Sequence, residues 1–135
     1  MYSFINRCRI TLPGDARSQT GWHQEMFQTV PQSNFIQIWA PMIHDATIDM
    51  GPVTLCTGSH NKLTQKSEWR ENTNGVSKMM FDSAIADHFD QIPMTLRLGQ
   101  AVIFSGCLLH GSQPNRSTKV RYSMVGLLHD MEDPH

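Results

Sequence analysis

Short runs in which apolar and polar residues alternate dominate the chain, and turn-forming residues separate these runs. Alternation with a period of two is typical of strands that bury one face. No stretch has the period of a long amphipathic helix. The sequence therefore predicts an all-β fold, an antiparallel barrel or jelly roll. The expected strands are Cys8–Leu12, Trp22–Val30, Phe35–Met42, Val53–Thr57, Met94–Leu98, Ala101–Phe104 and Val120–Leu128.

The remaining segments read as turns, loops or ambiguous structure. Pro13-Gly14-Asp15 and Gly99-Gln100 predict turns. Asn61–Ser77 is polar, lacks periodicity and contains Asn72-Thr73-Asn74-Gly75, so we expect a long surface loop there. Met79–Gln91 fits a short helix or an irregular strand. We find no internal repeat or linker and expect a single domain over residues 1–135.

Composition narrows the class of protein. Hydrophobic residues make up 39% and charged residues 17% of the chain, as in an ordinary globular protein. The formal net charge of −1 gives no electrostatic reason to bind nucleic acid or an anionic membrane. No apolar run approaches the roughly 18 residues of a membrane span, and Met1–Leu12 lacks the apolar core of a signal peptide. The three cysteines, Cys8, Cys56 and Cys107, are odd in number, widely spaced and without a Cys-x-x-Cys pattern. We therefore expect reduced thiols in a cytoplasmic protein.

The candidate chemistry begins at His23-Gln24-Glu25. In an extended strand, residues two apart point to the same face, so His23 and Glu25 would project together. With His110 as a distant third ligand they would form the two-His-one-carboxylate triad that holds non-haem Fe(II) and leaves coordination positions open. The His-x-acid motif alone is weak evidence for a metal site, because His88-Phe89-Asp90 matches it as well.

Sequence context favours the first pair. A set of segments, in order, resembles the phytanoyl-CoA dioxygenase family, from about Arg9 to His129. The resemblance starts at the iron-binding segment and ends at the closing ligand hairpin. Its pieces are Ser18–Glu25, Trp39-Ala40-Pro41, Asp45-Ala46-Thr47 through Gly51-Pro52, Gly58-Ser59-His60, Leu98–Phe104, His110-Gly111-Ser112, Asn115-x-Ser117 and Arg121.

The chain also departs from the family pattern. Glu25 stands where Asp is usual, Met50 replaces Asn, Thr57 replaces Pro and Gln100 replaces Asp, but none of these changes removes a metal ligand. Family members usually carry a further region before the His-x-acid segment, and most of it is absent here. We therefore expect exposed apolar sheet, with self-association as a homodimer or limited stability as a monomer.

The resemblance implies a double-stranded β-helix core and an Fe(II)- and 2-oxoglutarate-dependent dioxygenase. Such an enzyme uses O2 to hydroxylate a small-molecule substrate, which the sequence does not identify. The implied metal ligands are His23, Glu25 and His110. The implied co-substrate residues are Arg121, which would hold the distal carboxylate, Ser112 beside it, and Trp39 in the pocket wall.

The closing segment adds a geometric expectation. If a hairpin turns at Asn115-Arg116, His110 faces Arg121, and Ser112 points to the same side as His110. A metal ligand, a hydroxyl and a guanidinium would then converge, and a guanidinium can hold a carboxylate through two hydrogen bonds.

Other interpretations remain open at this point. The chain is alternatively a catalytically silent or partial jelly-roll binding module of the same family, or a metalloenzyme that needs no oxo-acid. His60 reads as a structural residue. The pairs His44-Asp45 and His129-Asp130 suggest a phosphohydrolase whose helices this sequence lacks. Arg121 could form a cross-strand ion pair, and Trp39 could simply fill the core.

Overall fold

Strands are the main regular elements of the computed structural model, which describes residues 2–27, 35–62, 67–71 and 77–129. The strands are β1 Tyr2–Thr11, β2 Phe35–Met42, β3 Val53–Cys56, β4 Ser67–Glu71, β5 Ser77–Phe81, β6 Gln91–Pro93, β7 Val102–Ser105, β8 His110–Ser112 and β9 Arg121–His129. The helical elements are single turns: α1 Ser83–Ala86 and the 3-10 turns η1 Ala16–Ser18, η2 Glu25–Phe27, η3 Ile48–Met50 and η4 Ser59–Asn61. The predicted all-β class is confirmed.

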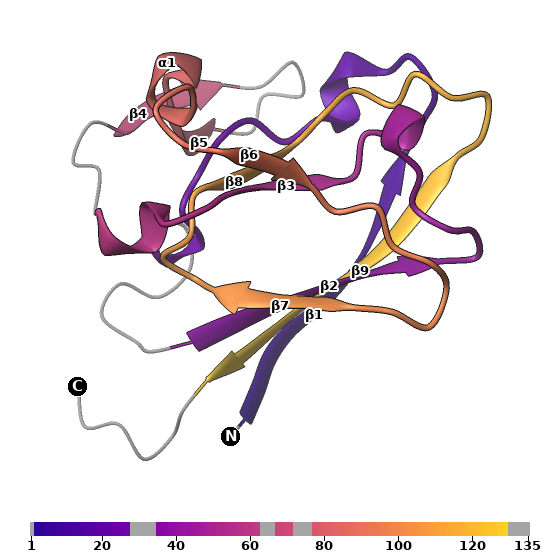
Figure 1. Cartoon of the computed structure of the whole chain (residues 1–135), viewed down its shortest axis with the longest axis horizontal. Coiled ribbons are helices and arrows are strands. Elements are labelled where there is room, and N and C mark those ends of the chain that lie inside the picture. Colours follow the sequence, from indigo (N-terminus) through magenta and orange to yellow (C-terminus); the bar gives the residue numbers. More distant parts are fainter. Residues whose placement is uncertain (1, 28–34, 63–66, 72–76, 130–135) are drawn as a thin grey trace.

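Two antiparallel sheets form the body of the molecule. One has the strand order β1-β9-β2-β7 and the other has the order β6-β3-β8, while β4 and β5 pair separately as a hairpin. The two larger sheets lie face to face as separate layers (Figure 1). This is the arrangement of a jelly roll, in which the side chains of two inner faces meet.

The core lies between these layers. Along β2 buried and partly exposed residues alternate, so every second side chain faces inward. Trp39 on β2 lies opposite Val125 of β9 and Val102 of β7. It packs in a buried cluster with residues from both sheets: Ala46, Val53, Leu55 and Phe104. Burying a large apolar side chain contributes about 1.5–3 kcal/mol, so this cluster helps to hold the two sheets together.

Several predicted strands are confirmed. β2 has the predicted bounds, β3 ends one residue earlier than predicted, and β7 and β9 are each shifted by one residue toward the C-terminus. The turn at Gly99-Gln100 is also present: Gly99 has a φ of +85°, and the Gln100 N–H donates to the Arg97 carbonyl at 3.1 Å. A positive φ is a conformation that glycine adopts without steric cost.

Three other predictions about local structure are wrong. Trp22–Val30 is not a strand, since His23 makes one isolated bridge and η2 follows; residues 28–30 lie outside the described part. Met94–Leu98 contributes one bridge, Ala46 to Leu96. Within the predicted loop Asn61–Ser77, the described residues include β4 and the start of β5, while residues 63–66 and 72–76 lie outside the described part. Strand formation depends on a pairing partner, which local patterns do not reveal.

The ambiguous segment Met79–Gln91 combines both expected forms. β5 continues to Phe81, and a single helical turn, α1, follows. The Asp82 side chain caps this turn by accepting a hydrogen bond from the Ala84 N–H at 3.0 Å. In the described residues no helix is long and apolar enough to cross a membrane.

The outer face of the four-stranded sheet carries exposed apolar side chains. Ile10, Met124 and Ile103 are 56%, 39% and 60% exposed, and they come from three strands of this sheet. Contiguous exposed apolar surface on a sheet favours association. The homodimer therefore stays a prediction, and the outer face of the four-stranded sheet is the surface through which we expect it to form.

We predict that Ile103→Lys weakens self-association, because it places a charge on this outer face without touching the core. Sedimentation at several protein concentrations should show the wild type moving toward dimer and the variant remaining monomeric. Ile48→Lys is a matched control, since Ile48 is also 60% exposed but lies on η3. A wild type that sediments as a compact, stable monomer at all concentrations contradicts the prediction.

Candidate metal centre

A short antiparallel bridge brings two histidines together. The His23 N–H donates to the His110 carbonyl at 2.9 Å, and the His110 N–H donates to the His23 carbonyl at 3.0 Å. Their rings lie side by side, with centroids 4.2 Å apart. Gly111 makes this approach feasible, because a Cβ there would lie 3.2 Å from both the Thr20 carbonyl oxygen and the Trp22 ring.

Glu25 completes a cluster of three candidate ligands. It begins the 3-10 turn η2, and its carboxylate folds back so that Oε2 lies 3.3 Å from His23 Nε2. The ligand atoms of His23, Glu25 and His110 all lie within 4.8 Å of one another, and all three residues are buried. The structure thus brings together the three predicted ligands, although a turn and not a strand positions the carboxylate.

Both imidazole rings are oriented through their second nitrogen. His23 Nδ1 lies 2.8 Å from the Gly21 carbonyl oxygen, and His110 Nδ1 lies 2.8 Å from the Leu108 carbonyl oxygen. A carbonyl only accepts, so Nδ1 carries a proton in each ring and Nε2 of each ring faces the cluster. Metal-binding histidines are commonly held in this way.

The His110 ring fits a metal ion better than it fits an apolar core. Its Nε2 is buried and has no hydrogen-bond partner among the described residues. Leaving such an atom unpaired costs about 1–3 kcal/mol, which a bound cation would offset. Burial and the neighbouring His23 lower the pKa of His110 to about 3, so this ring is neutral, as coordination requires.

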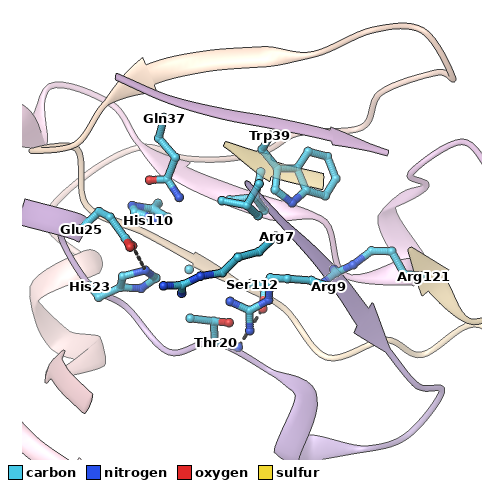
Figure 2. Close-up of a pocket in the computed structure, with 13 residues that line it drawn as sticks. Arg7, Arg9, Thr20, His23, Glu25, Gln37, Trp39, His110, Ser112 and Arg121 are labelled. Atoms are coloured by element: carbon cyan, nitrogen blue, oxygen red, sulfur yellow. Dashed lines mark hydrogen bonds and ion pairs between the residues drawn. The ribbon is translucent and has the colours of Figure 1, made fainter. Parts of the chain in front are cut away.

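The cluster opens into a pocket between the sheets (Figure 2). Ser112, Trp39 and Arg121, the predicted co-substrate residues, all line it. Trp39 packs in the core cluster and also borders the pocket, so its expected contact with the co-substrate stays a prediction. Ser112 Oγ accepts a hydrogen bond from the Thr20 N–H at 2.8 Å, which leaves the hydroxyl proton to donate to a ligand.

The predicted hairpin between His110 and Arg121 is wrong. β8 pairs with β3, so that His110 lies opposite Leu55, whereas β9 pairs with β1, so that Arg121 lies opposite Thr11. The connection between β8 and β9 crosses from one sheet to the other. It is held by the buried Asn115, whose amide donates to the Thr11 carbonyl at 3.0 Å and the Lys119 carbonyl at 2.8 Å. Neighbouring strands in sequence were thus mistaken for neighbours in a sheet.

Arg121 nevertheless faces the pocket and is suited to hold an anion. It is 4% exposed, and its Nη1 and Nη2 donate to the Met50 carbonyl at 3.1 Å and to Thr11 Oγ1 at 2.9 Å. These bonds fix the guanidinium, while the buried Nε has no partner within the described structure. Burial and then Arg9 lower the pKa of Arg121 to about 10, so it stays charged at neutral pH.

Three further pocket residues were missed from the sequence. Gln37 lines the pocket from β2, and its buried Oε1 has no hydrogen-bond partner among the described atoms. Arg7 and Arg9 line it from β1. The predicted strand began at Cys8, which excluded Arg7, and charged residues in a short strand are normally assigned to the solvent face. The available signal was their spacing of two in Arg7-x-Arg9-x-Thr11.

The competing histidine motifs do not assemble. His44, His60, His88 and Asp90 are exposed, and none belongs to the three-residue cluster found in the described part of the chain. His129 stacks on Phe35 with ring centroids 5.2 Å apart, and residue 130 lies outside the described residues. The structure therefore favours the His23 motif over its alternatives.

Solved structures similar to this one are oxygenase-fold proteins about twice as long. AviO1 from Streptomyces viridochromogenes Tue57 matches with a TM-score of 0.72 and 19% identity, over 99% of this chain and 53% of that protein. EvdO2 from Micromonospora carbonacea var. aurantiaca, complexed with 2-oxoglutarate, matches with a TM-score of 0.74 and 20% identity, over 96% of this chain and 54% of that one.

A third example is the epimerase SnoN in complex with Fe3+, alpha ketoglutarate and nogalamycin RO. It matches with a TM-score of 0.71 and 17% identity, over 95% of this chain and 49% of that protein. At these identities the likeness establishes the fold, and the chain spans about half the length of each of these proteins. No curated protein sequence matches the chain.

The sequence model of one family covers most of the chain. It matches residues 4–123, a range that includes the three clustered ligands, Arg7 and Arg9 on β1, and Arg121 on β9. The chain belongs to the phytanoyl-CoA dioxygenase family.

Proposed function

We propose that this chain acts as an Fe(II)- and 2-oxoglutarate-dependent oxygenase that hydroxylates a small organic molecule. The observation that carries the proposal is the buried Nε2 of His110, which has no partner among the described residues and lies beside the His23 ring and the Glu25 carboxylate. Two imidazoles and one carboxylate with open positions are the ligand set of non-haem Fe(II) oxygenases. Family membership supports the same assignment.

Bound Fe(II) would supply the oxidative chemistry, in which O2, 2-oxoglutarate and a C–H bond give succinate, CO2 and an alcohol. His23, Glu25 and His110 would hold the ion on one side and leave the opposite side open toward the pocket. The protein's own task is to bind, orient and exclude water. Burial of all three ligands provides that exclusion.

Arg121 and Ser112 would hold the co-substrate. The unpartnered Nε of Arg121 and the hydroxyl proton of Ser112 are both donors that border the same pocket. A carboxylate that accepts both would satisfy the buried Nε and place the remainder of 2-oxoglutarate toward the histidines. EvdO2, which shares this fold, was crystallised with 2-oxoglutarate.

A silent binding module explains the site less well. A module without a metal would gain nothing from a buried imidazole nitrogen that lacks a partner, because such an atom lowers stability. Replacing His110 with an apolar residue would then be favourable, yet the chain retains the complete ligand set.

We predict that the protein binds one Fe(II) per chain through these ligands. Anaerobic calorimetry with Fe(II), or with Mn(II) as a redox-stable substitute, should show affinity lowered by more than about 100-fold in His23→Ala and in His110→Ala, because each loses a direct ligand. His88→Ala is the matched control, since His88 belongs to the competing motif and is exposed. Loss of binding in His88→Ala alone would reject the assignment.

A second prediction concerns the co-substrate anchor. Arg121→Lys keeps a positive charge but loses the planar donor set, so we expect 2-oxoglutarate to bind the Mn(II)-loaded protein about 30- to 1,000-fold more weakly. Mn(II) affinity should be retained, because Arg121 is not a ligand.

Thr11→Val controls for the structural role of Arg121, since it removes the 2.9 Å bond to Nη2 and keeps the guanidinium. Calorimetry should show that Thr11→Val retains 2-oxoglutarate binding, even where its melting temperature falls. Equal 2-oxoglutarate affinity in the wild type and Arg121→Lys would refute the anchor.

A further inference from the structure

Three arginines line the pocket, and two of them, Arg7 and Arg9, have no role in binding the metal or the co-substrate. Arg7 and Arg9 lie on β1 two residues apart, and Thr11 on the same face lies opposite Arg121 of β9. Burial increases along this row, because Arg7 is exposed, Arg9 is half-buried and Arg121 is 4% exposed. The row therefore runs from the pocket mouth to its interior.

The alternation along β1 is the reverse of the usual pattern for a sheet edge. Arg7 and Arg9 face the pocket, whereas Cys8 and Ile10 between them are exposed on the outer face. A strand that buries one face normally directs apolar side chains toward the core and charged ones toward water. The partly buried guanidinium of Arg9 carries a desolvation cost, which an anionic ligand in the pocket would offset.

The two side chains reach the candidate metal centre. Figure 2 shows Arg7 extending from β1 toward His23, and Arg9 extending toward Thr20 and Ser112. Burial lowers the pKa of Arg9 and the adjacent Arg7 lowers it further, while Glu25 raises it. The pair thus consists of like charges held together in a partly desolvated space, an arrangement that an anion between them would stabilise.

Charge balance leaves these two arginines without a role in the proposed reaction. Among the described residues that line the pocket, three carry a guanidinium and one, Glu25, carries a carboxylate. Fe(II) and the 2-oxoglutarate dianion would cancel each other, and Glu25 would offset one of the three guanidinium charges. An excess of two positive charges remains, and a concave site with excess positive charge concentrates anions.

We propose that Arg7 and Arg9 bind an anionic group, a carboxylate or a phosphate, on the primary substrate. This inference rests on the proposed oxygenase function and adds the chemical class of its substrate. A guanidinium recognises either group through paired hydrogen bonds. Because Arg7 extends toward His23, the oxidised carbon would lie within a few bonds of the acidic group.

The test compares probes of equal length that differ in charge. Hexanoate, hexyl phosphate and the neutral hexanamide are titrated into protein loaded with Mn(II) and saturating 2-oxoglutarate, with calorimetry as the readout. We expect each anion to bind at least about tenfold more tightly than the amide. Raising the salt concentration should reduce this preference, since part of the site is open to solvent.

Substitutions then locate the preference. Arg7→Gln with Arg9→Gln should bring the anion-to-amide affinity ratio close to one while leaving the affinity for 2-oxoglutarate unchanged. Arg17→Gln is the matched control, because Arg17 is exposed, pairs with Asp15 at 2.8 Å and does not line the pocket; it should keep the wild-type ratio.

Three results would overturn the proposal: a wild-type ratio near one, an unchanged ratio in the double variant, or a loss of 2-oxoglutarate affinity in the double variant. The last result would assign the pair to the co-substrate. Failure of the wild type to bind 2-oxoglutarate would instead reject the oxygenase function. The ratio measured with Mn(II) alone would still decide whether Arg7 and Arg9 select anions.

Discussion

The pair of backbone hydrogen bonds between His23 and His110 is the interaction on which the site depends. It joins the segment that carries His23 to the first residue of β8, and β8 is itself held by β3. The same segment also accepts backbone hydrogen bonds from the Ser112 N–H of β8 at the Thr20 carbonyl and from the Phe81 N–H of β5 at the Trp22 carbonyl. Gln24, between two candidate ligands, is fully buried and donates to the Cys107 carbonyl at 2.6 Å. The ligand segment is therefore fixed against the loop that leads into β8, which allows a short turn to position Glu25 without a long strand.

The second constraint on the pocket is the connection from β8 to β9, which crosses between the sheets. Because of this crossing, both sheets contribute residues to the pocket wall. The metal ligands come from the side of the three-stranded sheet, and the arginines come from β1 and β9 of the four-stranded sheet. Gly51 supports this crossing, since it has a φ of +63° and a Cβ there would overlap the Gln113 carbonyl oxygen. The same turn presents the Met50 carbonyl to Arg121, so the crossing loop and the guanidinium are positioned together.

The sequence predicted the cluster of candidate ligands better than the backbone that carries it. The approach of His23, Glu25 and His110 was predicted because motif order survives changes in local geometry, and β2 and β9 were found because their alternation is regular. The 3-10 turn at Glu25 was missed, since a spacing of two fits both a strand and a folded-back turn.

The relation between β8 and β9 and the direction of Arg7 and Arg9 could not be read in the same way. Both depend on which strands pair, and pairing is decided by contacts between distant segments, such as Thr11 with Arg121. A tight turn and a crossing loop of similar length have similar polar sequences. That Arg7 and Arg9 point into the pocket can be inferred only once β9 is known to pair with β1.

The central claim is that the buried cluster is a working iron site and not a structural remnant. The most direct measurement is the formation of succinate from 2-oxoglutarate by the purified Fe(II)-loaded protein in the presence of O2, without added substrate. The account predicts succinate that requires both Fe(II) and O2 and that is absent in His110→Ala. A wild type that binds Fe(II) and 2-oxoglutarate but forms no succinate would contradict it.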